Sequence, residues 1–547
     1  MPRTTRFPTW RTSLAGAAVA ALALSAVSSA SAAGGAAAPE GVQLTGDRPV
    51  VRTDDGLLAG RQGAQMTQFL GIPYAQAPVG DLRWKAPQPV DSWDGVREAD
   101  QFGGSCTQGS GWDPGYETDT LNEDCLYLNV YVPSDADTSG PLPVLVWNHG
   151  GGNTGGAGRD TNPARFLASE DAVFVTINYR LGAMGWLDTA GLEQDNGEDG
   201  SAGNFGLLDQ QAALQWVQDN IGAFGGDARN VTLAGQSAGA SNTCSQLASP
   251  AAQDLFAKAI LHSGGCSSRD PETARTAGES FAVAAGCPDP ATQLACLREK
   301  TPQEILDAQR VAPTGGGGVF GNPVLPENSA TLLVEGRLTN KPVIVGGTSD
   351  ESQQSVFAAY DYKGSPLTEE SYAELVRATY PTAADQILAL YPAADYWSPT
   401  VAWGTVQSDQ RACTVQTLRS RLAADTATWT YEFAEQEGPA FTSIWRLGVD
   451  YPFGATHVND LGYLWDYLGT SLPFDSDQQE LSQTMITMWG DFVRSGNPNG
   501  PTTPDWPRYD QSAEIMRLVA PGSAAVPSAA VSADHGCSAW DTIAPLA

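Results

Sequence analysis

The stretch VTLAGQSAGA (231–240) places one serine, Ser237, among glycines and alanines directly after an apolar run. This G-x-S-x-G pattern is typical of a nucleophile elbow, a sharp turn between a strand and a helix that exposes a serine hydroxyl. Only very small side chains fit beside a serine held in such a strained turn. The chain contains 59 glycines, so the pattern can also arise by chance. The surrounding sequence has to show whether this stretch is a nucleophile elbow or a chance match.

A serine hydroxyl becomes a good nucleophile only when a base takes its proton and an acid orients that base. In a parallel α/β sheet of this kind the chain order is serine, acid, histidine. His149 precedes the serine, and His262 follows it too closely for an acid-bearing strand to fit between them. His535 lies in a Ser/Ala-rich tail. We therefore expect His457, in FGATHVNDL, to be the base, with an ordinary loop histidine as the alternative.

Two further features could complete such a site. Asp350 and Glu351 follow the apolar run KPVIVGG (341–347), and either could reach the catalytic end of the sheet. Neighbours that leave a strand end point in different directions, so only one of them is expected to face the histidine. The stretch WNHGGGNTGGAG (147–158) carries three successive glycines after another apolar run, and its backbone N–H groups could converge on an oxyanion. A flexible glycine loop is the alternative.

The elements that must position these groups are short apolar runs, rich in β-branched and aromatic residues, that alternate with helical patterns. Such runs predict buried strands, and the apolar spacings of three and four in 207–221 predict a helix. This alternation implies a mostly parallel sheet covered by helices on both faces, an α/β fold. The expected strands are 144–147, 172–179, 231–235, 257–263, 341–347 and 428–433.

The N-terminus predicts export. Arg3, Arg6 and Arg11 precede an apolar stretch and a small-residue cleavage pattern, so we expect a signal peptide over 1–32. No later segment is apolar enough over sufficient length to span a bilayer. The remaining residues, 33–547, show no internal repeat or linker, and one large domain with long insertions is the simplest organisation; GGGG (315–318) is expected to be a mobile loop.

Charge and composition limit the partners. The net charge of −32 disfavours nucleic acid and anionic lipid and gives a bias towards cationic substrates. No pattern indicates a transition metal, and DNGEDG (195–200) fits a solvated acidic loop better than a calcium site. We expect no metal and no cofactor. Eight cysteines in an exported chain indicate disulfides, and Cys287 and Cys296 bracket a short loop as a natural local pair.

Several long stretches resemble the type-B carboxylesterase/lipase family, which includes the cholinesterases. The resemblance covers nearly all of the chain after residue 32. It rests on FLGIPYAQAPVGDLRWKAPQPVDSWDG (69–95), EDCLYLNVYVP (123–133), VLVWNHGGG (144–152), NFGLLDQQAALQWVQDNIGAFGGDARNVTLAGQSAGA (204–240), LFAKAILHSGG (255–265) and VIVGGTSDE (343–351).

The resemblance implies an α/β-hydrolase fold and a Ser–Glu–His triad on Ser237, Glu351 and His457. It also places Gly151, Gly152 and Ala238 on the oxyanion-hole amides. The pairs Cys106–Cys125 and Cys287–Cys296 match disulfides of the family, and Cys413–Cys537 resembles a third bond of cholinesterases. Cys244 and Cys266, the remainder, would then pair beside the elbow.

Three residues depart from the family pattern. Gln236 stands where glutamate usually precedes the serine, and Ser352 follows Glu351 where glycine is usual. Asn153 replaces an aromatic residue after the glycine triplet and could make the acyl side of the pocket more polar. None of these departures removes a catalytic group, and those at Gln236 and Asn153 bear on substrate choice.

The resemblance leads to one main hypothesis, an exported serine hydrolase of short- to medium-chain carboxylic esters that needs no cofactor. The first alternative is a cholinesterase-like enzyme for cationic esters, because Trp112 lies near the position of a tryptophan that binds quaternary ammonium in cholinesterases. The second alternative is a non-catalytic binding protein, as in the adhesion members of the family. The sequence leaves the oligomeric state open, with a monomer as the default.

Overall fold

The computed structural model describes residues 43–45, 48–109, 120–136, 139–197, 200–440 and 447–543. The expected signal peptide (1–32) and Trp112 lie outside these residues.

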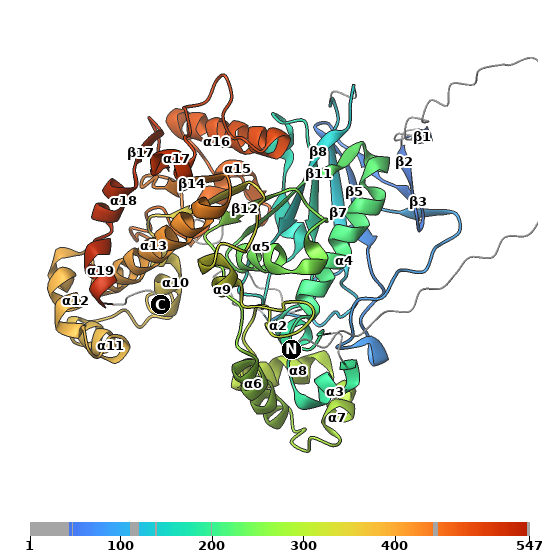
Figure 1. Ribbon diagram of the computed structural model, residues 1–547, viewed down its shortest axis with the longest axis horizontal. Helices are drawn as coiled ribbons and strands as arrows, with labels where there is room; N and C mark the ends of the chain where they lie inside the picture. The colour runs from blue at the N-terminus through green and yellow to red at the C-terminus, as the bar shows by residue number, and fades with distance from the viewer. Residues whose placement is uncertain are drawn as a thin grey trace, which may run out of the picture. The chain divides into compact units, whose positions relative to one another are not determined.

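The expected apolar strands form the middle of one large sheet (Figure 1). Their pairing is parallel from one to the next, as predicted for strands that alternate with helices. Antiparallel strands extend the sheet at both edges. Within the described residues the strand order is β17 (Ala524–Pro527), β16 (Glu514–Leu518), β14 (Thr428–Phe433), β13 (Val343–Thr348), β12 (Lys258–His262), β11 (Gly226–Gln236), β8 (Leu142–Asn148), β10 (Val173–Ile177), β7 (Tyr127–Pro133), β5 (Met66–Pro73) and β4 (Arg61–Gln62).

Alternate residues of each central strand face opposite sides of the sheet, so each strand contributes to two separate apolar cores. In β8, Val144 and Val146 belong to the core that contains α4 (Phe205–Asn220) and α5 (Ala238–Ala248). Leu145 and Trp147 belong to the core that contains α16 (Ser476–Ser495). Helices therefore cover both faces, which confirms the predicted α/β-hydrolase class.

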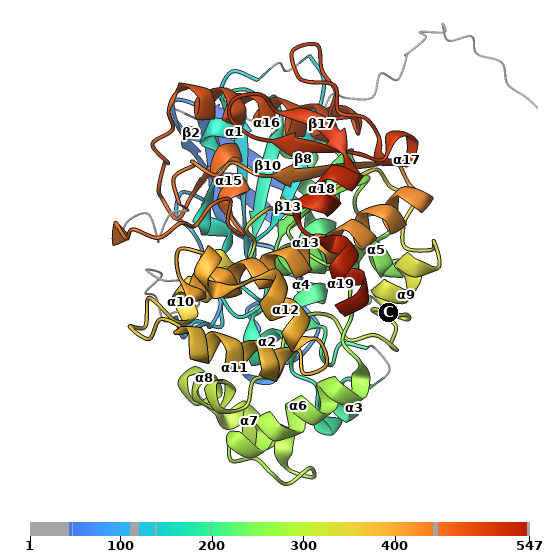
Figure 2. The same cartoon turned by 90° about the vertical axis from the view of Figure 1, so that its left-hand side faces the viewer.

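Two helical clusters flank this sheet. One has its own apolar core and lies at the lower end of both views (Figures 1 and 2); it consists of α3 (Ala190–Asn196), α6 (Pro271–Ala284), α7 (Gln293–Glu299) and α8 (Pro302–Val311). The other packs along the long helix α13 (Pro399–Asp425) and consists of α10 (Gln353–Ala359), α11 (Glu369–Thr379), α12 (Ala384–Leu390) and α19 (Cys537–Ile543).

Smaller elements complete the described fold. Two minor sheets contain β1 (Gln43–Thr45), β2 (Arg48–Thr53), β3 (Gly56–Ala59) and β6 (Val96–Glu98), and β9 (Thr161–Asn162) with β15 (Asp466–Tyr467). The remaining helices are α1 (Ala164–Leu167), α2 (Gly182–Trp186), α9 (Ser329–Val334), α15 (Asn459–Leu464), α17 (Tyr509–Ser512) and α18 (Ser528–Asp534). No helix among the described residues combines the length and apolar character needed to cross a membrane.

All eight cysteines are paired in disulfides, as an oxidising compartment predicts. The bonded pairs are those that the resemblance implied, including the remainder pair beside the elbow. They are Cys106–Cys125, Cys244–Cys266, Cys287–Cys296 and Cys413–Cys537.

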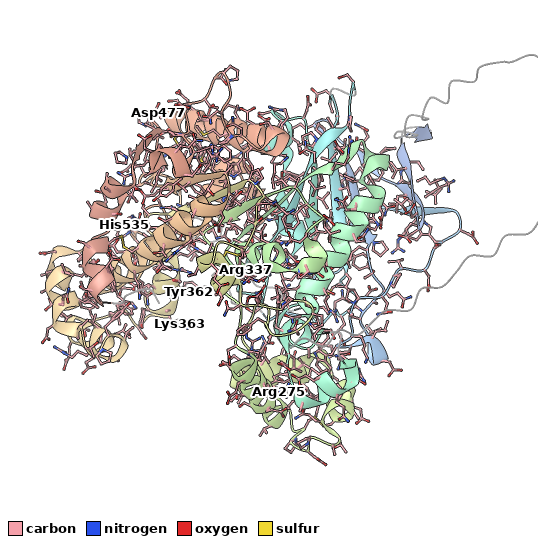
Figure 3. The ribbon with its side chains drawn as sticks, in the orientation of Figure 1. Arg275, Arg337, Tyr362, Lys363, Asp477 and His535 are labelled. Atoms are coloured by element: carbon pink, nitrogen blue, oxygen red, sulfur yellow. A yellow bond between two sulfur atoms is a disulfide. The ribbon has the colours of Figure 1, made fainter. Side chains whose placement is uncertain are left out.

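The buried His535, just before α19, ties the C-terminal segment to α13 and β14 (Figure 3). Its Nδ1 and Nε2 each lie 2.7 Å from a carboxylate oxygen, of Asp409 and Glu432 respectively. Burial alone would lower the pKa of His535, but hydrogen bonds and charge from the two carboxylates raise it to about 9. The imidazole is therefore a buried cation at neutral pH and donates from both nitrogens.

Other polar groups share these carboxylates. Arg517 of β16 donates to Glu432 at 3.0 Å, and the hydroxyl of Tyr391 donates to Asp409 at 2.9 Å. Burial raises the pKa of Glu432, but the hydrogen bond and charge of His535 and the charge of Arg419 outweigh that effect and lower it. The charge on His535 therefore belongs to a network and is not an isolated pair.

This network predicts pH-dependent stability. The folded-state pKa of His535 lies above the unfolded value of about 6.5, so its stabilisation is full below that pH and is lost as the pH rises through about 9. We expect the stability penalty of His535→Gln to shrink by roughly 3 kcal/mol between pH 6 and pH 10. Urea unfolding of the parent protein and His535→Gln across this pH range measures the penalty. An equal penalty at pH 6 and pH 10 would contradict the assignment of a buried imidazolium to His535.

Candidate active site

Ser237 occupies a strained turn between β11 and α5. Its φ of 55° and ψ of −122° lie in a region that residues with a side chain rarely adopt, at a cost of about 1–3 kcal/mol. The turn is held by its backbone N–H, which donates to the carbonyl of His262 on the neighbouring β12 at 2.8 Å. This conformation is that of a nucleophile elbow.

The two glycines of the G-x-S-x-G pattern allow close backbone contacts. A Cβ at Gly235 would lie 2.4 Å from the backbone of Gly239, and a Cβ at Gly239 would lie 2.2 Å from the carbonyl oxygen of Asn148. Any larger side chain would therefore push α5 away from the ends of β11 and β8. This close packing of α5 against the strands requires both glycines. The structure therefore gives no support to a chance match of the pattern.

His457 lies on the loop before α15 and lines the same cavity as Ser237. Its Nδ1 donates a hydrogen bond to Oε2 of Glu351, whose other oxygen, Oε1, accepts from the backbone N–H of Thr348 at 3.0 Å. An ionised carboxylate only accepts, so this contact assigns the ring proton of the neutral imidazole to Nδ1 and leaves Nε2 able to take a proton.

The carboxyl group of Glu351 is buried but stays ionised. Burial opposes its charge, yet the charge and hydrogen bond of His457 outweigh that effect and lower the pKa of Glu351 to about 2. Arg411 and the hydroxyl of Ser263 act in the same direction. The carboxyl group of Glu351 is therefore charged throughout the neutral pH range.

Asp350 points elsewhere. Its Oδ2 accepts from the backbone N–H of Ala455 at 3.1 Å and from the side chain of Gln436 at 2.7 Å, and its own N–H donates to the Ala455 carbonyl at 2.9 Å. Burial raises the pKa of Asp350. The residue thus orders the loop that leads to His457 and does not contact the imidazole.

The glycine loop after β8 presents amides to the cavity. Gly151 and Gly152 line it with φ of 107° and 63°, and a Cβ at Gly151 would lie 2.2 Å from the carbonyl oxygen of Gly155. Ala238 is the first residue of α5, whose N-terminus carries a partial positive charge. Within the described part of the chain, the N–H groups of Gly151, Gly152 and Ala238 have no hydrogen-bond acceptor.

Gln236 explains one departure from the family pattern. It is buried, and its Nε2 donates to the backbone carbonyl of His457 at 2.9 Å. A glutamate in this position could not donate that bond when ionised. The sequence singled out Gln236 but gave no partner for it, because the two residues are far apart along the chain.

Asn153, which the sequence suggested could make the acyl side of the pocket more polar, is not among the described residues that line the cavity. Its buried side chain exchanges two hydrogen bonds with Asn242 of α5, at 2.8 and 3.3 Å. The carbonyl of Asn153 also accepts from Gly182 at 2.7 Å. A Cβ at Gly316 would lie 2.7 Å from the Cβ of Asn153, so the glycine-rich loop at 315–318 packs against the glycine loop that follows β8.

The other histidines are engaged elsewhere. His149 is buried against Tyr179, and burial lowers its pKa to about 4. His262 is fully buried, accepts from Trp489 at 3.1 Å and lies 2.9 Å from Asp460. With His535 bound between carboxylates, His457 is the only one of the chain's four histidines that lines the cavity.

The cavity at this site measures about 270 Å³. Besides the groups already described, it is lined by Thr154, Gln354, Ser355, Ala358, Arg411, Val458 and Tyr467. A larger cavity of about 740 Å³ lies near Leu247 and Ala248, at the opposite end of α5 from Ser237. The described residues that line it include no serine or histidine. Within the described residues, no cluster of three or more His, Cys, Asp or Glu side chains could hold a metal ion.

Comparisons with known proteins find similarity over most of the chain. The model of the carboxylesterase family matches residues 47–528. Liver carboxylesterase 1 of Oryctolagus cuniculus is 32% identical over 530 residues, which cover 87% of this chain and 91% of that protein. Cholinesterase of Mus musculus is 32% identical over 511 residues, covering 84% and 81%. A solved PNB esterase structure superposes with a TM-score of 0.73 at 28% identity and covers 89% of this chain and 99% of its own.

The two adjacent carboxylates should differ sharply when neutralised. We expect Glu351→Gln to lower kcat by roughly 10³- to 10⁴-fold, because the amide no longer fixes the tautomer of His457. Asp350→Asn should lower kcat by about tenfold at most, through the geometry of the loop. Steady-state kinetics on folded variants tests this, and an exchange of the two outcomes would show that the assignment of Glu351 is wrong.

Gln236→Met keeps the size of the side chain but removes the donor to the His457 carbonyl. We expect kcat to fall by about 3- to 10-fold with little change in KM, since the loop that carries the base loses one restraint. Gln215→Met, an exposed position on α4, is the matched control and should retain the parental kcat. Equal rates for the two folded variants would remove Gln236 from the positioning of His457.

Proposed function

The protein belongs to the carboxylesterase family and is a carboxylic ester hydrolase, and from this premise we propose that it acts through an acyl-enzyme on Ser237. The observation that carries the proposal is the cavity in which a serine on a strained turn and a histidine paired with a buried carboxylate lie together. The comparisons support ester hydrolysis as a class, and the local geometry supports the route.

In the proposed acylation, Nε2 of His457 takes the proton of the Ser237 hydroxyl while Oγ attacks the ester carbonyl carbon. The carbonyl oxygen becomes an oxyanion and accepts from the N–H groups of Gly151, Gly152 and Ala238. The imidazolium then returns the proton to the leaving alkoxide oxygen, the alcohol departs, and the acyl group stays on Oγ. Glu351 stabilises the imidazolium without taking its proton.

Deacylation repeats these steps with water. His457 takes a proton from water, the hydroxide oxygen attacks the acyl carbon, and the second oxyanion uses the same amides. Collapse of this intermediate expels the Ser237 oxygen, which recovers its proton from the imidazolium. One ester and one water yield one acid and one alcohol, and no cofactor is consumed.

A secreted enzyme is part of the proposal. The N-terminal pattern of three arginines, an apolar stretch and small residues supports export, and four disulfides support an oxidising destination. A soluble monomer remains the default expectation.

Short- to medium-chain acyl or aryl esters are the proposed substrates. The cavity of about 270 Å³ is slightly below the range of about 300–1,000 Å³ usual for drug-sized ligands. The cholinesterase-like alternative has less support, because Tyr467 is the only aromatic residue among the described lining and Arg411 would repel a cationic substrate. A non-catalytic binding role would leave the paired catalytic groups without a purpose.

A fluorophosphonate probe tests the acyl-enzyme route. We expect one covalent adduct on Ser237 in the folded protein, located by peptide mass analysis, and none in Ser237→Ala. That variant should also lose roughly 10⁶-fold in kcat, as expected when a nucleophile is removed. Hydrolysis of esters without an adduct on Ser237 would exclude the proposed route.

A series of p-nitrophenyl esters from acetate to palmitate tests the proposed size of the acyl group. We expect kcat/KM to peak at short or medium chains, because the cavity is small. Maximal activity on emulsified palmitate would contradict this part of the proposal.

A further inference from the structure

Arg411 contributes a positive charge to the lining of the catalytic cavity. It lies on α13, its side chain is exposed, and it is the only lysine or arginine among the described residues that line the cavity. Its charge reaches the catalytic groups, since it contributes to the lowered pKa of Glu351. An arginine in this place is unexpected in a chain with 62 acidic and 30 basic residues.

The helix that carries Arg411 is firmly held. The hydroxyl of Ser408, one turn before it, accepts from the backbone N–H of Ser352 at 2.9 Å, directly beside Glu351. Two residues after it, Cys413 is bonded to Cys537. Side chains on rigid helices keep their position better than side chains on loops, so the backbone of Arg411 has a defined place relative to Glu351.

No carboxylate in the described part of the chain neutralises Arg411 by direct contact. Among the described residues, none of the ion pairs within 4.0 Å includes it. Glu351, the only acidic side chain among the described residues of the lining, already uses one oxygen for His457 and the other for Thr348. The guanidinium therefore keeps donors for a molecule that enters the cavity.

The rest of the described lining offers no competing charge. Thr154, Gln354 and Ser355 are polar but neutral, and Ala358 and Val458 are apolar. A planar guanidinium matches a carboxylate in both charge and shape and can donate two parallel hydrogen bonds to it. Carboxylate binding is the simplest use of such a group beside a reacting ester.

We propose that Arg411 selects esters that carry a free carboxylate at a distance from the scissile carbonyl. This inference rests on the proposed function, since it names the substrate class of the same site. The carboxylate can belong to the acyl part, as in a half-ester of a dicarboxylic acid, or to the alcohol part, as in an acylated hydroxybenzoate. In both cases water cleaves the acyl–oxygen bond, and the carboxylate bound by Arg411 is unchanged.

Two matched pairs of esters distinguish these sources. The p-nitrophenyl half-ester of adipate and p-nitrophenyl hexanoate differ by a carboxylate on the acyl chain. The esters para-acetoxybenzoate and para-cresyl acetate differ by a carboxylate on the alcohol. For each pair the measured quantity is the ratio of kcat/KM for the charged ester to kcat/KM for the neutral one.

We expect Arg411→Gln to lower this ratio by about 10- to 100-fold for at least one pair, which identifies the side that Arg411 contacts. Arg411→Lys should give an intermediate ratio, because it keeps the charge but loses the planar fork. Arg421→Gln, at an exposed position ten residues further along α13, is the matched control and should leave the ratio unchanged. Added salt should lower the ratio for the parent protein more than for Arg411→Gln.

Other outcomes separate the two proposals. If Arg411→Gln slows both members of each pair equally, Arg411 acts through Glu351 and the inference is overturned while the proposed function stands. An unchanged ratio with unchanged rates overturns it as well. If the parent protein hydrolyses none of the esters and Ser237 takes no fluorophosphonate adduct, the proposed function fails and the inference fails with it.

Discussion

The close approach of α5 to the ends of β8 and β11 is the constraint on which the site depends. It exists because Gly239 brings its backbone against the Asn148 carbonyl, where a Cβ would lie 2.2 Å away. The strained turn at Ser237 follows from it and is fixed by the carbonyl of His262. The ring of that histidine contacts Asp460 of α15, three residues after His457, so one buried residue links the turn that carries Ser237 to the helix that follows His457.

The sequence predicted the centre of the fold because parallel strands buried on both faces leave a strong signal. The run at 428–433 coincides with β14, and the neighbouring runs differ from their strands by a few residues at the ends. The edges were not predicted. In β5 and β7 intermediate exposure interrupts the buried pattern, and β4 and β17 are too short to give a period. The helices along α13 pack mainly on each other, so the pattern of the strands could not predict their position.

The proposed nucleophile, the proposed base and the glycine loop could be named from the sequence because each follows or interrupts a recognisable element. The choice of Glu351 over Asp350 needed the family resemblance, and their contacts show why chain position alone left it open. What the sequence could not provide were contacts between distant side chains. Gln236 bonds the His457 carbonyl and Asn153 pairs with Asn242, so two departures from the family pattern have partners that no local spacing reveals. The sequence did not indicate that Arg411 lines the cavity, because an arginine in a helix is most often exposed to solvent.

Asp350 and Glu351 both follow the end of β13, but their pKa values are shifted in opposite directions. Both are removed from water, which by itself raises the pKa of each. Glu351 faces an imidazole and the field of Arg411, and these reduce its pKa to about 2. Asp350 has only neutral hydrogen-bond donors and its pKa rises. A site that must stabilise an imidazolium needs the first environment, and a loop that must be held in place is served by the second. The adjacent positions are therefore not interchangeable, although both carry a carboxyl group, because the direction in which each leaves β13 decides which charges it meets.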